Sequence, residues 1–341
     1  MKNYKKKYLE NLSRTNNAVN EPPTPYGNKC LYCYEPLTQG EAHFHQACNK
    51  RFFGQLYTPT LGYNLGDLQK LATQIIQSQM AVTGVQAKVS LSLHRKEDKN
   101  TTKKLTIVGL YGDYILKPPS EYYPELPELE NATMRMAERC GIATVPNSLV
   151  YLQDETLCYI TKRVDRTRKG KLQMEDMCQL SERLTEDKYK GSHEQVAKLV
   201  LKYSSSPLLD VSNFYEQVLF SFFTGNADMH LKNFSLLEKE NLGMVLSPAY
   251  DLVPTVLVNE ADTEELALNL NGKKRKLNYN DFLAAFENGG LNKKVLDNTL
   301  ELFRYCKPEM FAVLDKSFVS DDFKMKYKKV VNARYEQLGL E

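Results

Sequence analysis

Asp228, Asn233 and Asp251 carry side chains that together suit phosphoryl transfer. Asp228 and Asn233 stand five residues apart, and Asp251 follows eighteen residues after Asn233. In phosphoryl-transfer sites an Asp accepts the proton of the attacking hydroxyl, an Asn five residues later binds one Mg²⁺, and an Asp beyond a short hairpin binds another. The spacing therefore predicts Asp228 as the catalytic base, with Asn233 and Asp251 as magnesium ligands.

The chemistry of the metal agrees with these residue types. Mg²⁺ prefers hard oxygen ligands and takes only one or two from protein carboxylates, while phosphate and water supply the others. Lys232, in the same segment, is predicted to offset the charge that gathers on the transferred phosphoryl group. His230 is a further catalytic candidate without an assigned task. An alternative is an Asx-turn network, in which the Asn and Asp side chains only bond backbone groups.

A lysine and a glutamate upstream are candidates for positioning nucleotide phosphates. Lys117 ends an apolar run and precedes Pro118, and Glu130 stands on the helix predicted to follow. A strand lysine paired with a helix glutamate positions ATP phosphates in kinases. Glu128 is a rival partner. Alternatively, Lys117 is a solvent-facing strand end and Glu130 a favourable acid near a helix N-terminus.

The segment before the first predicted strand contains a single glycine and ends in a lysine. Backbone amides in such a loop can hold phosphate oxygens. The loop lacks a G-x-G-x-x-G pattern and also fits an ordinary turn. Its candidate nucleotide-binding residues are Thr83, Gly84, Val85, Gln86 and Lys88.

Hydrophobic periodicity divides the chain into a strand-rich part and a helical part. Apolar alternation predicts strands at 89–93, 105–110, 114–117, 148–152 and 157–162, with helices at 65–77 and 129–140, the second ended by Gly141. Later helices are expected at 194–203, 211–223, 279–286, 293–303, 309–314 and 321–338, and a hairpin joins 234–237 to 244–246. This order predicts an α+β, bilobal, protein-kinase-like fold with a small β-rich lobe and a larger helical lobe.

The expected organisation has four parts. Residues 1–28 form a tail rich in Asn, Lys and Pro, expected to be flexible. Residues 29–54 form a small cysteine-containing module, 65–164 the β-rich lobe and 165–341 the helical lobe. The polar segment 95–104 is expected to be a flexible connection between strands.

Composition is that of an ordinary globular protein. The chain has 341 residues, of which 42 % are hydrophobic, so it can bury a sizeable core. A net charge of +3 gives no argument for a nucleic-acid-binding surface. Since no apolar stretch approaches a membrane span or a signal peptide, and seven scattered cysteines fit reduced thiols, we expect a cytoplasmic protein.

Two close pairs of metal-binding residues stand near the N-terminus. Cys30 and Cys33 are separated by two residues, as are His45 and Cys48. This set suits a tetrahedral Zn²⁺ site of Cys3His type, which is structural because no coordination position stays open. His43 is an alternative ligand. The alternative to a metal site is a loop domain with reduced thiols.

At this point the chain resembles the HipA-like serine/threonine kinases, the toxin components of bacterial toxin–antitoxin pairs. The resemblance runs from about residue 65 to the C-terminus. It rests on the loop 83–88, the strand 115–118 and the helix around Glu130, and on the segments 162–166, 175–179, 228–235 and 248–251.

The resemblance implies functions for residues already selected and for one more segment. Asp228 would be the base, Asn233 and Asp251 the magnesium ligands and Lys117 the phosphate-binding lysine, with Lys162 to Val164 as the hinge beside adenine; in the hinge, Lys162 and Val164 are nucleotide-binding candidates. It also implies ATP as cofactor and a protein substrate. Relatives phosphorylate aminoacyl-tRNA synthetases, and a DNA-binding antitoxin of helix-turn-helix type restrains them, so nucleic acid is an indirect partner.

Two departures from the family pattern stand out. Family members often carry an autophosphorylated serine just before the loop glycine, whereas Ala81, Val82 and Thr83 precede Gly84 here, with Ser78 and Thr83 as the available hydroxyls. Longer members begin with an additional N-terminal subdomain where this chain has the cysteine module. Contacts with an antitoxin are therefore not transferable residue by residue.

Three functions are compatible with the sequence. The first is an ATP- and Mg²⁺-dependent protein kinase that acts as a toxin. The second is a kinase for a small molecule, which shares the fold and metal chemistry. The third is a non-catalytic, nucleotide-binding partner of a DNA-binding repressor.

Overall fold

The computed structural model describes residues 28–70, 88–94, 103–108, 112–167, 169–259 and 261–340. Several sequence predictions lie outside these ranges: the tail up to residue 27, the end of the helix 65–77, the loop residues Thr83, Gly84, Val85 and Gln86, and most of the connection 95–104. Within the described residues, no helix is both long and apolar enough to cross a membrane.

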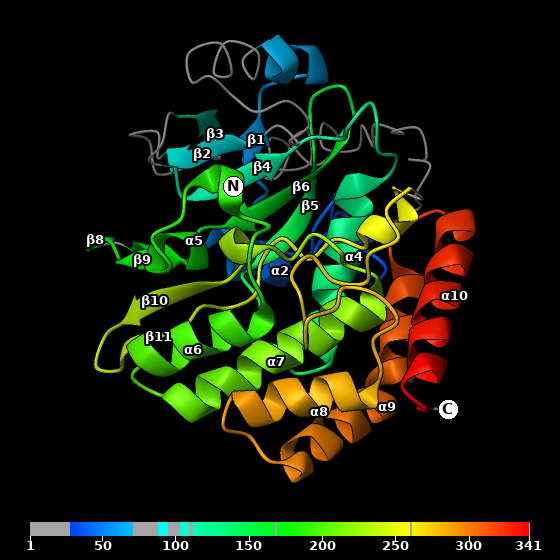
Figure 1. Cartoon of the computed structure of the whole chain (residues 1–341). Helices are drawn as coiled ribbons and strands as arrows, with labels where there is room; N and C mark the ends of the chain where they lie inside the picture. Colours follow the sequence, from blue (N-terminus) through cyan, green and yellow to red (C-terminus); the bar gives the residue numbers. More distant parts are fainter. Residues whose placement is uncertain are drawn as a thin grey trace, which may run out of the picture.

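A six-stranded sheet forms the smaller lobe, in the upper half of Figure 1. Its strand order is β1-β3-β2-β4-β6-β5, and every pairing is antiparallel except β1 with β3. The strands are β1 (Thr60–Leu61), β2 (Val89–His94), β3 (Lys104–Ile107), β4 (Tyr114–Lys117), β5 (Asn147–Tyr151) and β6 (Leu157–Lys162).

Most of these strands are where alternation predicts them. β4 and β6 have the predicted bounds, and β5 begins one residue early. The two-residue β1 has no counterpart in the prediction, because a strand this short carries no readable period.

One helix covers the sheet and links it to the other lobe. α4 (Leu126–Arg139) packs against β5 and β6 on one side and against α9 (Lys293–Lys316) on the other. Pro127 is at the start of α4, where a missing N–H has no cost, and Gly141 lies just past its end at φ +83°. Because α4 is buried on both sides, its orientation is set by the two lobes together.

The larger lobe is mostly helical and lies in the lower half of Figure 1. Its helices are α5 (Met177–Leu180), α6 (His193–Tyr203), α7 (Pro207–Thr224), α8 (Tyr279–Asn288), α9 and α10 (Asp321–Gln337), with short 3₁₀ turns at Thr185–Asp187, Leu231–Asn233 and Thr255–Leu257. The apolar α7 runs through the centre of this lobe, where Phe214, Phe220, Phe222 and Phe223 are all fully buried.

Two small sheets complete the lobe. The predicted hairpin is present as β10 (Ser235–Lys239) paired with β11 (Gly243–Leu246), and β9 (Met174–Asp176) adds a third strand. β7 (Arg166–Thr167) pairs with β8 (Gly170–Lys171) where the chain leaves the first sheet. A β-rich lobe followed by a helical lobe confirms the predicted α+β class.

The prediction of two separate helices at 293–303 and 309–314 is wrong. α9 is continuous from Lys293 to Lys316 with Pro308 inside it. A proline removes one helical hydrogen bond and crowds the preceding turn, but buried Phe303 and Met310, on either side of Pro308, pack into the core. Tertiary packing therefore offsets the local cost.

Candidate functional site

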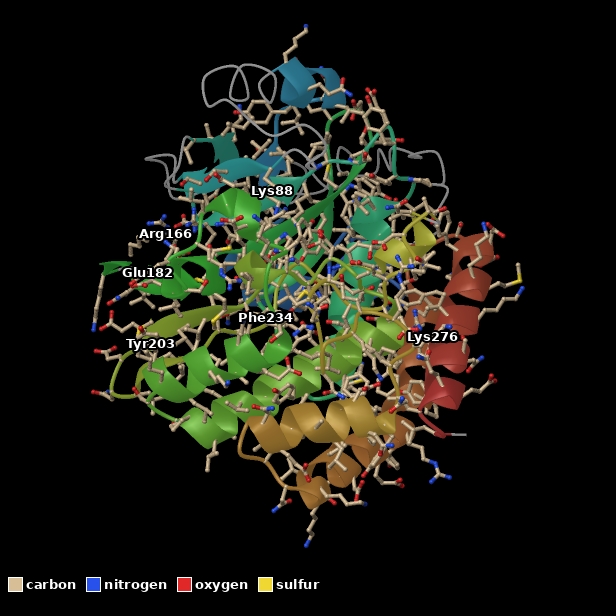
Figure 2. The ribbon with its side chains drawn as sticks, viewed as in Figure 1. Lys88, Arg166, Glu182, Tyr203, Phe234 and Lys276 are labelled. Atoms are coloured by element: carbon tan, nitrogen blue, oxygen red, sulfur yellow. The ribbon has the colours of Figure 1, made fainter. Side chains whose placement is uncertain are left out.

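The side chains of Lys88, Lys117 and Asp251, which come from three separate segments of the chain, lie together. Asp251 follows β11 and has φ +60°, a left-handed conformation that Asp tolerates better than most residues. Its Oδ1 accepts a hydrogen bond from Lys117 Nζ of β4, and its Oδ2 lies 3.1 Å from Lys88 Nζ. Figure 2 labels Lys88 in the upper lobe. The two lysines thus join the sheet to the helical lobe through one carboxylate.

Lys117 also contacts helix α4. Its Nζ lies 2.6 Å from Glu130 Oε1 of α4, and Lys117 and Glu130 are 4 % and 0 % exposed. The rival Glu128 is buried as well, but within the described residues its carboxylate makes no ion pair. The structure therefore places the predicted lysine and one of its two candidate glutamates in a buried pair.

Burial and charge act in opposite directions on these groups. Burial would raise the pKa of Asp251, but Lys117 and Lys88 outweigh it and hold that pKa well below its usual value. Burial raises the pKa of Glu130 to about 7, against the opposing effect of Lys117. Burial would lower the pKa of Lys117, but Asp251 and Glu130 raise it. Lys117 is thus held as an ammonium group, the form that binds phosphate oxygens.

Asp228 accepts a hydrogen bond that the sequence did not predict. Tyr189 OH donates to Asp228 Oδ1 over 2.5 Å, from a segment about forty residues earlier. The Tyr189 ring also contacts the His230 ring edge-on, with centroids 5.1 Å apart. Since no motif marks Tyr189, only its place in the fold identifies it as part of the site.

Backbone bonds fix the loop between Asp228 and Asn233. His230 N–H donates to Asp228 O, 2.8 Å, and Asn233 Nδ2 donates to the same carbonyl oxygen, 3.0 Å. The amide nitrogen of Asn233 is therefore engaged, which directs Oδ1 as the ligand atom. Tyr250 OH donates to Lys232 O over 2.9 Å and so ties the loop to the residue before Asp251. The predicted base and metal ligands belong to one connected structure.

The other candidates have more peripheral positions. Lys232 Nζ binds Asp176 Oδ2 at the start of α5, 2.8 Å away, rather than Asp228 or Asp251. Burial lowers the pKa of His230 despite the opposing effect of Asp228, so its ring is held neutral. Lys162 is exposed at the end of β6 and Val164 is half-buried just beyond, in the link between the lobes.

The four residues of the predicted zinc site are also brought together. One ligand atom from each of Cys30, Cys33, His45 and Cys48 lies within 4.8 Å of the others. The alternative ligand His43 has its ring against Tyr151 instead, with centroids 5.1 Å apart.

Known proteins are similar to this chain in sequence and in fold. The chain is 26 % identical over 304 residues to a protein of Haemophilus influenzae named "Putative kinase", a match that covers 79 % of this chain and 85 % of that protein. It is 30 % identical over 245 residues to "Putative kinase Y4dM" of Sinorhizobium fredii, covering 66 % of this chain and 58 % of that protein.

Among solved structures, the chain is similar to HipA of Shewanella oneidensis MR-1, determined in complex with HipB and operator DNA. The TM-score is 0.62 at 21 % identity, over 78 % of this chain and 70 % of HipA. At this identity the likeness shows the fold alone, and it agrees with the predicted bilobal kinase-like fold. The family model described as the HipA-like C-terminal domain matches residues 80–307. This chain is a member of the HipA-like C-terminal domain family.

Proposed function

We propose that this protein is an ATP- and Mg²⁺-dependent phosphotransferase that phosphorylates a serine or threonine hydroxyl of another protein. The observation that carries the proposal is the cluster of Lys88, Lys117, Glu130 and Asp251 across the two lobes. Relatives named as kinases support the same reaction class.

The residues fit the proposed chemistry. Asp251 presents both carboxylate oxygens to cations, and the engaged amide nitrogen of Asn233 leaves its oxygen for a metal. Mg²⁺ held by these two side chains would neutralise phosphate charge and orient the phosphates. With a cation on Asp251, the ammonium groups of Lys88 and Lys117 are available to phosphate oxygens. Glu130 keeps Lys117 oriented from the opposite side.

Asp228 is proposed as the base. Its carboxylate already accepts a hydrogen bond from the Tyr189 hydroxyl, so it can accept one from a substrate hydroxyl in the same way. The His230 backbone N–H and the Asn233 side-chain amide both donate to Asp228 O and so fix the loop that presents this carboxylate. In the proposed reaction Asp228 orients the hydroxyl and receives its proton as the oxygen attacks the γ-phosphorus; the bond from this phosphorus to the β,γ-bridging oxygen breaks, and ADP leaves.

Substrate and partner follow from the family resemblance. We propose a translation component, with an aminoacyl-tRNA synthetase as the first substrate to test. We also propose a separately encoded DNA-binding partner of helix-turn-helix type, since HipA of Shewanella oneidensis was solved with HipB and operator DNA.

Incubation with labelled ATP and Mg²⁺ in extract of the source cells tests the proposal. We expect one labelled protein with wild type and none with Asp228→Asn, and mass spectrometry then identifies the phosphorylated residue. Label that appears only in small molecules would replace the protein substrate by a metabolite. Absence of Mg²⁺-dependent transfer from a folded, ATP-binding protein would reject the enzyme.

A further inference from the structure

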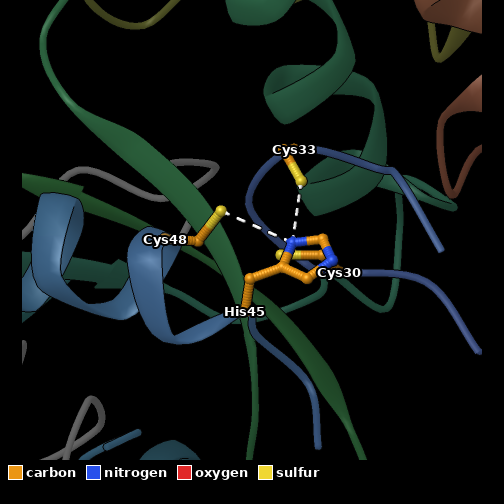
Figure 3. Close-up of side chains that lie close together, drawn as sticks. All are labelled: Cys30, Cys33, His45 and Cys48. Atoms are coloured by element: carbon orange, nitrogen blue, oxygen red, sulfur yellow. Dashed lines mark hydrogen bonds between the residues drawn. The ribbon is translucent and has the colours of Figure 1, made fainter. Parts of the chain in front are cut away.

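The cysteine module contains a preformed cluster of ligands that the proposed reaction does not use. Figure 3 shows the sulfur atoms of Cys30, Cys33 and Cys48 arranged around the imidazole ring of His45. Nδ1 of this ring lies 3.3 Å from Cys33 Sγ and 3.7 Å from Cys48 Sγ. All three cysteines are free thiols.

These separations match the edges of a zinc tetrahedron. With Zn–S of about 2.3 Å and Zn–N of about 2.0 Å, tetrahedral angles put sulfur and nitrogen about 3.5 Å apart. The two measured distances lie on either side of this value. Three thiolates and an imidazole favour Zn²⁺ over Mg²⁺ or Ca²⁺, which prefer oxygen. The set also leaves no position for a substrate.

The second nitrogen of His45 supports the assignment. Nε2 lies 2.9 Å from the carbonyl oxygen of Pro36, which accepts only if Nε2 carries the proton. Nδ1 then has its lone pair directed to the sulfur atoms. A backbone carbonyl that fixes the tautomer in this way is the usual support of a metal-binding histidine.

The module makes little regular structure of its own. Residues 28–54 contain α2 (Gln46–Phe53) and one isolated bridge, Lys29 to Pro36. Small modules of this size rarely fold without a disulfide, a bound metal or another cross-link. We propose that Cys30, Cys33, His45 and Cys48 bind one structural Zn²⁺, and that the module closed by this ion holds α4 and β4 in position.

Contacts from the module to α4 are buried and specific. Tyr34 OH donates to Asn131 Oδ1 over 2.5 Å, and both residues are at most 4 % exposed. The guanidinium of Arg135, one turn later, lies over the Tyr32 ring at 4.1 Å. Because Asn131 is next to Glu130, this anchor fixes the turn of α4 that carries the glutamate.

The same module reaches the sheet. Phe52 and Phe53 of α2 pack on Tyr114 of β4, with ring centroids 5.8 and 6.0 Å apart. The carbonyl of Leu31 accepts a hydrogen bond from Ser148 Oγ of β5, 3.2 Å. Tyr114 starts the strand that ends at Lys117. The module therefore touches both elements that carry the Lys117–Glu130 pair, and its positioning effect on catalysis rests on the proposed function.

Metal content of the full-length protein tests the site. We expect one Zn²⁺ per chain in wild type and in His43→Asn, and loss of the metal in His45→Asn and Cys48→Ser. Co²⁺ in the wild-type site should give the intense visible and thiolate charge-transfer absorption of a tetrahedral complex, a readout that requires no variant. A disulfide within the module, an iron cluster, or metal lost from His43→Asn but kept by His45→Asn would overturn the site.

Hydrogen exchange tests the anchor without reference to activity. Removal of Zn²⁺ by a chelator should increase amide exchange in α4 and β4, while α8, whose main contacts are with α6 and α9, stays unchanged. Equal exchange in α4 with and without the metal would overturn the anchoring role.

A kinetic comparison then separates this inference from the proposed function. Tyr34→Phe should keep zinc and lower kcat about tenfold, without raising KM for the protein substrate. Lys29→Met, which removes contacts of the module with the carbonyls of Lys316 and Ser317, should match wild type. A wild-type kcat in Tyr34→Phe contradicts the positioning role. If the wild-type protein is inactive, the proposed function is contradicted, and the zinc content and hydrogen exchange alone decide whether the module binds Zn²⁺ and anchors α4.

Discussion

Lys117 of β4 and Asp251 of the loop after β11 belong to different lobes, yet their side chains form an ion pair. Lys117 also forms an ion pair with Glu130, and Asp251 also forms one with Lys88, so four charged residues form one chain of ion pairs. Any ligand that binds Asp251 competes with two lysines. The proposed Mg²⁺ would replace the positive charge of the two lysines at Asp251. The phosphates of ATP would then give the released lysines a negatively charged partner.

Lys117→Met should lower phosphoryl transfer at least about hundredfold, because it removes a fixed positive charge from the proposed phosphate site. The change also leaves Glu130 buried without its cation, so the carboxyl should take up a proton. Steady-state transfer from labelled ATP measures the effect. Lys239→Met, at the exposed end of β10, is the matched control. Equal rates in the two variants would remove Lys117 from the site.

Asp251→Asn should abolish Mg²⁺-dependent transfer and preserve the fold. Asn tolerates the left-handed backbone at φ +60°, so the substitution adds little strain. Wild-type turnover in this variant would exclude Asp251 as a metal ligand.

The same variant has a predictable pH dependence of stability. The pKa of Asp251 is depressed in the folded state from about 3.9 in the unfolded chain. Its ionised form therefore adds stability above about pH 4, and this contribution is lost as pH falls through the lower folded value. The stability difference between wild type and Asp251→Asn should shrink below about pH 4. Urea unfolding at several pH values measures it, and a constant difference would contradict the depressed pKa.

Tyr189→Phe should lower KM for the protein substrate, because its hydroxyl occupies the hydrogen-bonding position on Asp228 that a substrate hydroxyl needs. The phenylalanine ring can keep the edge-on contact with His230. ATP binding should not change. Steady-state kinetics in which the concentrations of the protein substrate and of ATP are varied separately give the KM for each. A raised KM for the protein substrate would show that Tyr189 assists its binding instead.

His193 should make the protein sensitive to acid. It is buried against Phe214 and Phe234, and burial lowers its pKa to about 3, whereas the unfolded value is about 6.5. The unfolded chain binds a proton below about pH 6.5 that the folded chain does not, so stability falls as pH falls from 6.5 toward 3. His193→Leu should lose less stability over that range. Thermal unfolding from pH 7 to 4 tests this, and identical slopes would contradict it.

Local pattern predicted much of the fold and part of the site. The strands at β4 and β6 follow from apolar alternation, and the end of α4 follows from Gly141. The separation of Asp228 and Asn233 is short enough for one loop to fix their relative position, so the motif alone predicts that they lie close together. Likewise the two-residue spacings need only a local turn to bring Cys30 next to Cys33 and His45 next to Cys48, whereas the fold of the module brings the two pairs together.

Distant contacts were beyond the sequence. Glu128 and Glu130 are two residues apart and so point about 200° apart around a helix, and only the packing of α4 against the sheet decides which one meets Lys117. Tertiary packing also decides the hydrogen bond from Tyr189 to Asp228 and the continuation of α9 past Pro308. The sequence by itself determined the residue types and local spacings, because these depend on neighbouring residues. The tertiary structure decided the partners across the lobes, because those depend on how whole elements pack.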